Sequence, residues 1–492
     1  MKPERICSLR SYIQKLDELG DIQKIDQEVD WNLELSAVIR RSYDLMAPAP
    51  LFTNVKGCSG FRVFGAPASL SSRADLRMAR IALSLGLSPA TPATDLVEAL
   101  ANGHKKTPVS PTVVDESACK EIILLGDQVD LTQLPAPMIH EGDGGRYINT
   151  WGVIITQNPR GSWTNWSVAR IMLLDKRRIL IGTGAAQHVS NIYNEWQKCG
   201  EPMPFALALG VEPAIPFVGG MPLPSEVSEA DFLGGYFGES IEVIRCETNS
   251  LTVPASAEIV LEGTISHMEA ADEGPMGEYA GYIWLNQTRK QPVVTINAVT
   301  HRNNAILPVV AAGPPVEEDH TCWGLGIAAQ LLHELRCAGF PVKRCFSPFE
   351  SAIHWLVVTV DDRFKNRAES NDLVRLLRDF LIQSRPFMYM PKFFLIDDQI
   401  DPSNARELIW AVATRLHPTQ GTTFIENVPI MKHTGSISPE ERLLGYGTKV
   451  IYNCLGPYPA GNFIPKATTF RSGWPLDIQE KVISKWHDYG YD

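Results

Sequence analysis

Several features that would point to a particular class of protein are scarce in this chain of 492 residues. Its nine cysteines are odd in number, and no two of them form a C-x-x-C pair. A disulfide framework or a cysteine-ligated zinc site is therefore not expected, whereas reduced thiols in the cytoplasm are. No apolar run approaches the ~20 residues that a membrane span needs. The opening segment is charged and lacks the apolar core of a secretory signal, so we expect a cytoplasmic protein with no membrane partner.

Positive charge is also scarce, because 45 lysines and arginines face 56 aspartates and glutamates, for a formal net charge of -11. The sequence shows no basic cluster that would attract a phosphate backbone, so a nucleic-acid partner is not expected. What the chain does contain is apolar: 44% of its residues are hydrophobic, which is enough for a large core. At roughly 100–200 residues per domain, its length predicts two to four domains.

The sequence pattern divides the chain into three regions, 1–118, 119–315 and 316–492. A polar, proline-bearing stretch near residues 104–120 marks the first boundary. In the first region, apolar residues at helical spacing predict an amphipathic helix over 8–19. Further helical segments are predicted at 79–85 and 93–101, mixed with short strands.

The middle region is rich in predicted strands. The sequence WGVIITQNPRGSWTNWSVARIMLLD (151–175) predicts two strands joined by a turn at Asn158–Gly161. Many strands with few helices favour a barrel-like or sandwich-like β domain. Later strands are predicted at 240–246, 257–264, 292–300 and 306–311.

The last region alternates between helices and strands, which predicts crossovers and a largely parallel α/β sheet. Asn404 and Glu407 are spaced like a helix capping box. The amphipathic tail at 476–489 has two interpretations: a helix packed on its own domain, or a helix donated to a neighbouring subunit. The helices are predicted at 323–338, 371–383 and 404–415, and the strands at 353–360 and 393–396.

Three sets of polar residues in the middle region are candidate ligands. Asn165 and Arg170 lie in WTNWSVAR, His188 follows a glutamine, and Glu229 follows Gly219–Gly220. Spacing alone favours a structural role for each, and strict strand alternation would place Asn165 and Arg170 on opposite faces. Together, however, an amide oxygen, an imidazole and a carboxylate suit Mn²⁺ or Mg²⁺ completed by phosphate oxygens.

The segment Glu273–Gly274–Pro275–Met276–Gly277–Glu278 is the most suggestive for catalysis. Its proline and glycines favour a turn that would bring the two glutamates together. Two close carboxyl groups cannot both ionise cheaply, so one can remain an acid at neutral pH while Arg170 holds the other as a carboxylate. The alternative is a surface turn with two solvated acids.

Several long blocks resemble the UbiD-like decarboxylase family, especially its branch of ferulic acid and pyrrole-2-carboxylate decarboxylases. They occur in order along the chain, and the resemblance covers nearly all of it. The blocks are LPAPMIHEGDGGRYINTWGVIITQNPRGSWTNWSVAR (134–170), QH (187–188), MPLPSEVSEADFLGG (221–235), PASAEIVLEGTI (254–265) and EGPMGEYAGY (273–282).

The resemblance implies prenylated FMN as cofactor, supplied by a separate flavin prenyltransferase, together with Mn²⁺ and K⁺. By position, Asn165, His188 and Glu229 would bind Mn²⁺. The K⁺ shell would involve Trp166, Val218, Met221 and Arg415. The flavin contacts would be Ser167, Val168, Ala169, Arg170, Gln187, Gly220, Met221 and Pro222, with Arg385 at a position where relatives can carry a phosphate-binding lysine.

The resemblance also assigns catalysis to Arg170, Glu273 and Glu278, with Glu278 as proton donor after CO₂ leaves. The reaction would be a reversible, non-oxidative decarboxylation of an aromatic, heteroaromatic or α,β-unsaturated acid. Asp319 would accept a hydrogen bond from a ring N–H or a phenol, favouring an indole or pyrrole carboxylate, unless it pairs with His320 or a lysine instead. The substrate pocket would include Gly184, Tyr279, Asp319, Trp323 and Met388.

The implied fold is a mixture of α/β and β domains: an N-terminal α/β domain, a central split β-barrel that binds the flavin, and a C-terminal α/β oligomerisation domain with a terminal helix. The implied assembly is a homodimer or homohexamer. Two rival interpretations remain. One is a non-catalytic flavin-binding or assembly subunit of a multi-component decarboxylase, and the other is a metal-dependent lyase or hydrolase that works without flavin.

Overall fold

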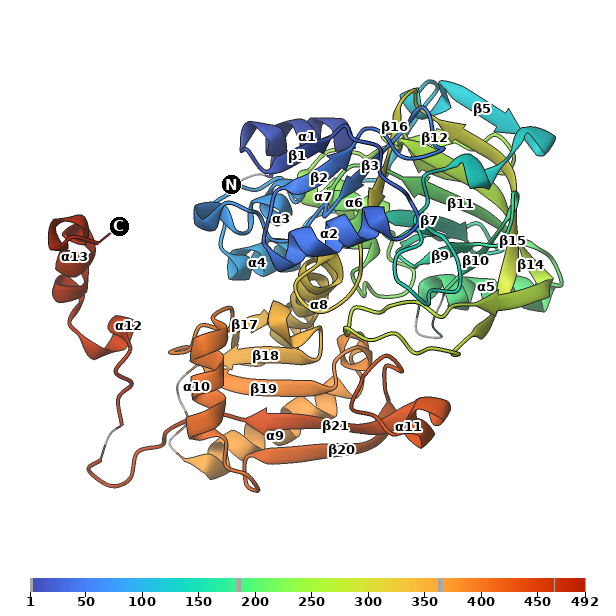
Figure 1. Cartoon of the computed structure of the whole chain (residues 1–492). Coiled ribbons are helices and arrows are strands. Elements are labelled where there is room, and N and C mark those ends of the chain that lie inside the picture. The colour runs from blue at the N-terminus through green and yellow to red at the C-terminus, as the bar shows by residue number, and fades with distance from the viewer. Residues whose placement is uncertain are drawn as a thin grey trace.

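The computed structural model describes residues 3–182, 184, 187–361, 364, 366–463 and 465–491. Figure 1 shows a helix-covered N-terminal part, a strand-rich middle part and a C-terminal sheet flanked by helices, followed by an extended tail. The predicted mixture of α/β and β architecture is confirmed. Within the described residues, no helix combines the length and the apolar character that crossing a membrane requires.

The N-terminal part is built on a four-stranded sheet of order β1-β2-β3-β16. Its last strand comes from far along the chain and pairs in parallel with β3. The predicted helix over 8–19 is confirmed as α1, with the Ser8 side chain accepting a hydrogen bond from the Ser11 backbone N–H as its N-cap. The strands are β1 (Ile22–Ile25), β2 (Ala49–Phe52), β3 (Phe61–Gly65) and β16 (Ala305–Val309); the helices are α1 (Leu9–Glu18), α2 (Glu34–Asp44), α3 (Ala79–Ser84) and α4 (Ala93–Gly103).

The middle part is a nine-stranded antiparallel sheet that curls into a half-barrel. Its order is β6-β9-β10-β15-β14-β11-β7-β8, with β5 paired to β15. These strands are β5 (Ile122–Leu125), β6 (Tyr147–Asn149), β7 (Gly152–Gln157), β8 (Thr164–Ser167), β9 (Ile171–Leu173), β10 (Arg178–Ile181), β11 (Met203–Leu209), β14 (Ile259–Glu273) and β15 (Arg289–His301). A small sheet joins β4 (Thr112–Val114), β12 (Glu242–Arg245) and β13 (Thr252–Pro254), and the helices are α5 (His188–Cys199), α6 (Ala214–Gly219) and α7 (Glu229–Phe237).

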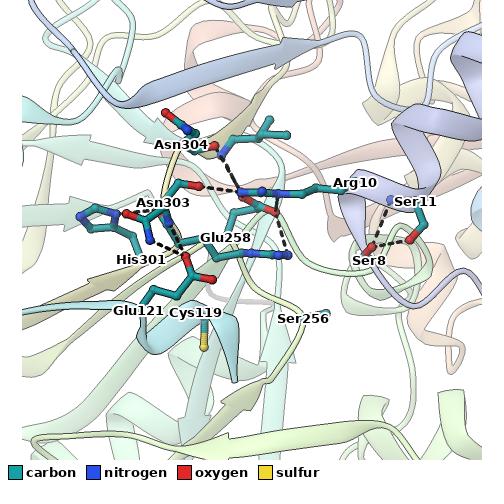
Figure 2. Close-up of polar contacts among 12 residues, drawn as sticks. Ser8, Arg10, Ser11, Cys119, Glu121, Ser256, Glu258, His301, Asn303 and Asn304 are labelled. Atoms are coloured by element: carbon teal, nitrogen blue, oxygen red, sulfur yellow. Dashed lines mark hydrogen bonds and ion pairs between the residues drawn. The ribbon is translucent and has the colours of Figure 1, made fainter. Parts of the chain in front are cut away.

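The N-terminal and middle parts are joined by a buried carboxylate. Glu258, which precedes β14, accepts two hydrogen bonds of 2.8 Å from the guanidinium of Arg10 on α1. Figure 2 shows Arg10 reaching across to Glu258. The same carboxylate accepts the Ile306 backbone N–H of β16 at 3.1 Å. Because a buried carboxylate needs donors, this arrangement ties α1 and β16 to the half-barrel.

The C-terminal sheet has the order β17-β18-β19-β21-β20, and only part of it agrees with the largely parallel sheet that was expected. The inner pairs β18–β19 and β19–β21 are parallel, whereas both edge pairs are antiparallel. The segment between β17 and β18 is too short for the crossover that a parallel pair requires. The strands are β17 (Val342–Phe346), β18 (Trp355–Val360), β19 (Lys392–Asp397), β20 (Thr422–Pro429) and β21 (Tyr446–Asn453); the helices are α8 (Gly324–Cys337), α9 (Arg367–Leu381), α10 (Ala405–Arg415) and α11 (Pro439–Leu444).

Two local features of this region bear on the sequence interpretations. Asn404 caps α10 as predicted, but Glu407 accepts a hydrogen bond from the Asp401 backbone N–H rather than completing a capping box on Asn404. The tail forms α12 (Phe470–Gly473) and α13 (Leu476–Ser484), neither of which has a buried residue. Figure 1 shows the tail, in red, apart from the rest of the chain, so the helix does not pack on its own domain.

Candidate active site

The strand that carries Asn165 and Ser167 is interrupted where the candidate residues converge. β8 ends at Ser167, and β9 pairs with β6 and β10 instead of continuing beside β7. The connecting residues are held by side chains, since Asn149 Nδ2 donates to Ala169 O at 2.7 Å. A continuous strand would have placed Asn165 and Arg170 on opposite faces. The interruption allows both to line one cavity.

Arg170 lies between the two glutamates of the proline–glycine segment. Its Nε and Nη2 donate to Glu273 Oε1 and Oε2 at 2.8 and 3.1 Å, and its Nη1 contacts Glu278 Oε1. Glu273 is 1% exposed and also accepts a hydrogen bond of 3.1 Å from the Tyr147 hydroxyl. The turn is therefore not a surface turn with two solvated acids, and the guanidinium ties both carboxyl groups together.

The bend between the glutamates depends on close backbone contacts. Gly274 has a φ of +87°, a conformation that favours glycine. Gly144 packs against it so tightly that a Cβ at Gly144 would lie 2.1 Å from Gly274 O. The bend is fixed by hydrogen bonds from Gly144 N to Pro275 O at 2.8 Å and from Gly277 N to Asp143 Oδ1 at 3.0 Å. These contacts position Glu278 at the cavity.

The carboxyl groups next to Arg170 stabilise its positive charge. Burial lowers the pKa of Arg170, but the adjacent carboxylates of Glu278 and Glu273 outweigh burial and raise the pKa above its ordinary value. The residue is consequently a permanent cation in the cavity. A guanidinium of this kind can hold a carboxylate in a fixed, two-point geometry.

A second polar cluster gathers Asn165, His188 and Glu229. Asn165 Nδ2 donates to Glu229 Oε1 at 2.7 Å, and His188 Nδ1 lies 3.4 Å from Asn165 Nδ2 and 3.9 Å from Glu229 Oε1. Ser167 Oγ donates to Asn165 Oδ1 at 2.5 Å, and Trp166 N donates to Glu229 Oε2 at 2.8 Å. The three residues are at most 4% exposed. His188 and Glu229 are the first residues of α5 and α7, so two helix starts bring them together.

This cluster has the chemistry of a cation site that is completed from outside. Burial raises the pKa of Glu229, although His188 and the Trp166 N–H oppose the shift, so ionising this carboxyl group calls for a nearby cation. Within the described ranges, no three His, Cys, Asp or Glu side chains converge as a metal site. A metal here would need the Asn165 amide oxygen and exogenous oxygens. The guanidinium of Arg385 also reaches the cluster, where Nη1 contacts His188 Nε2.

Both clusters border one cavity of about 240 Å³. It brings together most of the residues singled out from the sequence, and a few stay outside its lining. Inside are Asn165, Ser167, Val168, Ala169, Arg170, Gly184, Gln187, His188, Gly220, Met221, Glu229, Glu273, Glu278, Tyr279, Asp319, Trp323 and Arg385; outside are Trp166, Val218, Pro222, Met388 and Arg415.

Arg415 and Met388 are the two outside residues whose contacts are informative. Arg415, on α10, is buried, and its guanidinium forms an ion pair with Asp397 at the end of β19, outside the cavity lining. The Met388 backbone O accepts a hydrogen bond of 3.0 Å from Lys449 Nζ. Met388 is not among the residues that line the cavity.

The carboxyl group of Asp319 has no hydrogen bond or ion pair with any described residue. It lines the cavity at the start of a π-helical turn, Asp319–Trp323, and is only partly exposed. The alternative pairing with His320 is not formed, because His320 Nδ1 accepts the Glu317 N–H and Nε2 donates to Tyr279 O at 2.8 Å. Burial, followed by the charges of Glu278 and Glu318, raises the pKa of Asp319 to about 7.

Aromatic rings form the wall next to Asp319. The Tyr279 and Trp323 ring centroids are 5.4 Å apart in an edge-to-face arrangement, and Trp323 meets Tyr389 at 5.2 Å in the same way. All three rings line the cavity. Such a wall favours a planar, unsaturated ligand.

Sequence reasoning missed several residues that face this cavity, among them His433 and Arg289. His433 follows β20, and its Nδ1 lies 3.1 Å from Glu278 Oε1. Arg289 opens β15 and lines the cavity. Neither is in a recognised block, and both come from segments that only the folded chain brings to this cavity. A search for titratable residues just before or after strands would have nominated them, along with many others.

Comparisons with known proteins agree with this geometry. Three family models match in order: the N-terminal, Rift-related and C-terminal domains of 3-octaprenyl-4-hydroxybenzoate carboxy-lyase (UbiD), over residues 13–100, 112–315 and 320–454. The chain is 38% identical over 487 residues to pyrrole-2-carboxylic acid decarboxylase of Pseudomonas aeruginosa, covering 98% of each chain. It is 35% identical over 492 residues to ferulic acid decarboxylase 1 of Saccharomyces cerevisiae, again covering 98% of each.

Among solved structures, the chain is similar to the UbiD-class enzyme HmfF from Pelotomaculum thermopropionicum in complex with FMN. The TM-score is 0.78 at 25% identity, covering 94% of this chain and 97% of that one. The family models span most of the chain, and the curated relatives match it almost from end to end. This chain therefore belongs to the UbiD family and is a carboxy-lyase.

Proposed function

We propose that this enzyme catalyses the reversible, non-oxidative decarboxylation of an aromatic, heteroaromatic or α,β-unsaturated carboxylic acid, with prenylated FMN and Mn²⁺. The observation that carries the proposal is the position of Arg170, bonded to Glu273 and Glu278 in the same cavity as the buried Asn165–His188–Glu229 cluster. The names of the relatives, a pyrrole-2-carboxylic acid and a ferulic acid decarboxylase, indicate the same class of substrate.

The residues present fit a phosphate-bearing flavin and a divalent ion. A buried carboxylate, an imidazole and an amide oxygen supply part of a Mn²⁺ shell, and cofactor phosphate would complete it. Arg385, which already reaches His188, would bind the same phosphate. K⁺ beside the phosphate would take backbone oxygens near Trp166, Val218 and Met221, whereas the pairing of Arg415 with Asp397 favours an indirect role for that residue. The flavin contacts we propose are Ser167, Val168, Ala169, Gln187, Gly220, Met221 and Pro222.

Bound prenylated FMN would supply the electron sink that decarboxylation of an unsaturated acid requires. The chain supplies charge and a proton. Arg170 would orient the substrate carboxylate, and Glu273, held by Tyr147, would fix the guanidinium. Glu278 would deliver the proton to the carbon that loses CO₂.

Glu278→Gln tests this assignment. The protein is produced with a flavin prenyltransferase, and CO₂ release is measured on a panel of unsaturated acids. We expect Glu278→Gln to lose more than about 100-fold in turnover while retaining the cofactor spectrum, since general-acid catalysis contributes about 10²–10⁴-fold. Glu269→Gln is the matched control, because Glu269 lies on β14 and pairs with exposed Arg178. Near-normal turnover of Glu278→Gln with cofactor bound would refute the assignment.

The metal site has its own test. Glu229→Gln should lower the Mn²⁺ content of purified protein, measured by elemental analysis, because the only carboxylate of the cluster is removed. Glu226→Gln, on the exposed loop before α7, should leave the content unchanged. Equal metal content in both variants would remove Glu229 from the ligand set.

Asp319 supports an acid that carries a hydrogen-bond donor, such as an indole or pyrrole carboxylate. Its carboxyl group has no hydrogen bond from any described residue, and a buried polar group is costly without a partner. A ring N–H placed between the aromatic wall and Asp319 would supply one. Asp319→Ala should therefore lose more activity on N–H acids than on acids without a donor. An equal loss on both groups would exclude this role.

The two rival functions predict different behaviour. A non-catalytic flavin-binding or assembly subunit would bind flavin but release no CO₂ from any acid. A metal-dependent lyase or hydrolase would be colourless and active with metal alone. An absorption spectrum of the co-expressed protein and the CO₂ assay together separate both rivals from the proposed decarboxylase.

The division into domains and the assembly are also proposals. We propose an N-terminal domain over 1–118, a flavin domain over 119–315, and an oligomerisation domain over 316–492. β16, which lies in the flavin domain's part of the sequence, completes the sheet of the N-terminal domain. The detached tail supports an assembly in which α13 packs on a neighbouring subunit of a homodimer or homohexamer.

A further inference from the structure

A second pocket, of about 500 Å³, lies beside the active-site cavity. Residues from the segment that leads into β15 form one side, and residues between β20 and the end of α11 form the other. It contains three cationic side chains, Arg289, Lys432 and Arg442, and no aspartate or glutamate among the residues that the structure describes lines it. In a chain with a formal net charge of -11, a local cluster of positive charge is unusual.

This outer pocket and the active-site cavity share a wall. Arg289 lines both of them. On the opposite side, Lys432 lines the outer pocket, whereas its two neighbours, Met431 and His433, line the cavity. The outer pocket therefore adjoins the cavity that contains Arg170.

Two of the three cations are already engaged in holding the pocket together. Arg442 lies 3.8 Å over the Trp284 ring, and its Nη2 donates to Thr434 O at 3.0 Å. Lys432 Nζ donates to Leu443 O at 3.2 Å. The backbone of Arg289 pairs with Glu273 in the β14–β15 ladder, but its side chain has no hydrogen bond or ion pair with any residue in the described ranges. It is a half-buried guanidinium whose planar donor face is available to a carboxylate.

The inner cavity carries more carboxyl groups than guanidinium groups. Its lining includes the acids Glu229, Glu273, Glu278, Glu318 and Asp319, against the arginines Arg170, Arg289 and Arg385. The carboxyl groups that are ionised would oppose the entry of a carboxylate substrate. An available cation at the entrance would offset this repulsion and raise the local substrate concentration.

We propose that Arg289 forms an outer carboxylate-binding subsite, which captures the substrate's carboxylate in the basic pocket and passes it to Arg170. The inference rests on the proposed function and adds a binding step before it. Arg289 acts on capture and leaves the chemical step to the inner residues.

The chain provides a matched control in the next residue. Lys290 carries the same charge, but its Nζ pairs with Asp272 at 2.9 Å, and its side chain is 68% exposed away from both pockets. Arg289→Gln and Lys290→Gln therefore change the net charge of the protein equally. Only Arg289→Gln removes the subsite.

The experiment compares the cofactor-loaded wild type with both variants at low and high ionic strength. We expect Arg289→Gln to lower kcat/KM about 5-fold at low salt through KM, the effect of losing one charge-assisted contact. The difference should shrink at high salt, where charges are screened beyond about 3–8 Å. Lys290→Gln should resemble the wild type. Equal effects of the two variants, or a loss of kcat with unchanged KM in Arg289→Gln, would overturn the proposal.

A binding measurement separates this inference from the proposed function. Cyclohexanecarboxylate has no carbon–carbon double bond or aromatic ring to react, so its binding can be measured by calorimetry whether or not the enzyme turns over. We expect Arg289→Gln to weaken this binding about 5-fold and Lys290→Gln to leave it unchanged. If no acid is decarboxylated but the probe distinguishes the variants, the proposed function fails and the subsite stands. If the wild type is active but the probe binds all three proteins alike, the subsite fails alone.

Discussion

The imidazole Nδ1 of His433 lies 3.1 Å from the Glu278 carboxylate, although the two residues come from different parts of the fold. Burial lowers the pKa of His433, and the nearby guanidinium groups of Arg170, Arg289 and Arg442 act in the same direction, while Glu278 opposes them. His433 is therefore best described as a neutral ring next to Glu278. A neutral imidazole can donate to the Glu278 carboxylate or accept from its protonated form.

We expect His433→Leu to reduce kcat about 10-fold and His433→Asn to stay within about 3-fold of the wild type, as asparagine keeps a donor near the Nδ1 position. The comparison isolates the hydrogen bond to the proton donor, because both variants remove the imidazole ring. Equal losses of kcat in the two variants would indicate a purely steric effect.

Asp319 predicts a pH-dependent stability. Its pKa is raised to about 7, so the folded state holds this proton more tightly than the unfolded chain does. Ionising Asp319 in the folded protein is unfavourable, and stability should fall as pH rises from about 4 to about 7. The free energy of unfolding of Asp319→Asn, taken relative to that of the wild type, should therefore be about 1–3 kcal/mol larger at pH 8 than at pH 4. Urea unfolding of the apoprotein at both pH values measures the difference, and a constant offset between the two proteins would contradict it.

The buried pair of Asp21 and Arg80 predicts a large loss of stability on mutation. Arg80 donates to both Asp21 carboxylate oxygens, at 2.7 and 2.8 Å. The side chain of Asp21 is 0% exposed and that of Arg80 is 1% exposed. Asp21→Asn should cost about 3–5 kcal/mol, because Arg80 is left as an uncompensated buried charge. The exposed pair of Arg73 and Asp75 gives the control, and Asp75→Asn should change the urea midpoint little.

The same pair has a definite pH dependence. Burial raises the pKa of Asp21, but the hydrogen bonds and charge of Arg80 outweigh it, and the pKa lies below its ordinary value. The stabilisation is complete above the unfolded pKa, about 4, and is lost as pH falls through the lower folded value. The difference in free energy of unfolding between the wild type and Asp21→Asn should therefore become smaller under strongly acidic conditions. A difference that is unchanged down to low pH would contradict the assignment.

The tail predicts a change in assembly. Trp474, Leu476, Ile483 and Trp486 are exposed by 50, 68, 65 and 42%, which is costly unless a partner covers them. A chain that ends at Leu455 should keep the three-part fold and form a smaller assembly, as measured by light scattering with circular dichroism as the folding control. Replacing Leu476 and Ile483 by serine should act in the same direction, because both changes remove apolar contact area. An assembly unchanged in both variants would show that the tail does not join subunits.

Local chemistry in the sequence determined much of this protein. Periodicity predicted α1 and several strands of the middle and last regions, and residue type predicted the Asn404 N-cap, since each depends on residues that are close in the chain. The UbiD-like blocks nominated Arg170, Glu273 and Glu278, and their proline–glycine bend brings both glutamates to Arg170 as predicted. These features depend on short-range patterns that one sequence carries.

Tertiary structure decided what depends on long-range contacts. The strand is interrupted after Ser167, so that Asn165 and Arg170 both line one cavity. The interruption results from a change of strand partners, which the alternation of side chains within one strand cannot show. The pairing of β16 with β3 joins residues far apart in the chain. His433 and Arg289 line the cavity, and the Arg415 guanidinium pairs with Asp397. These contacts could not be predicted from neighbours in the chain, because each joins residues of different elements.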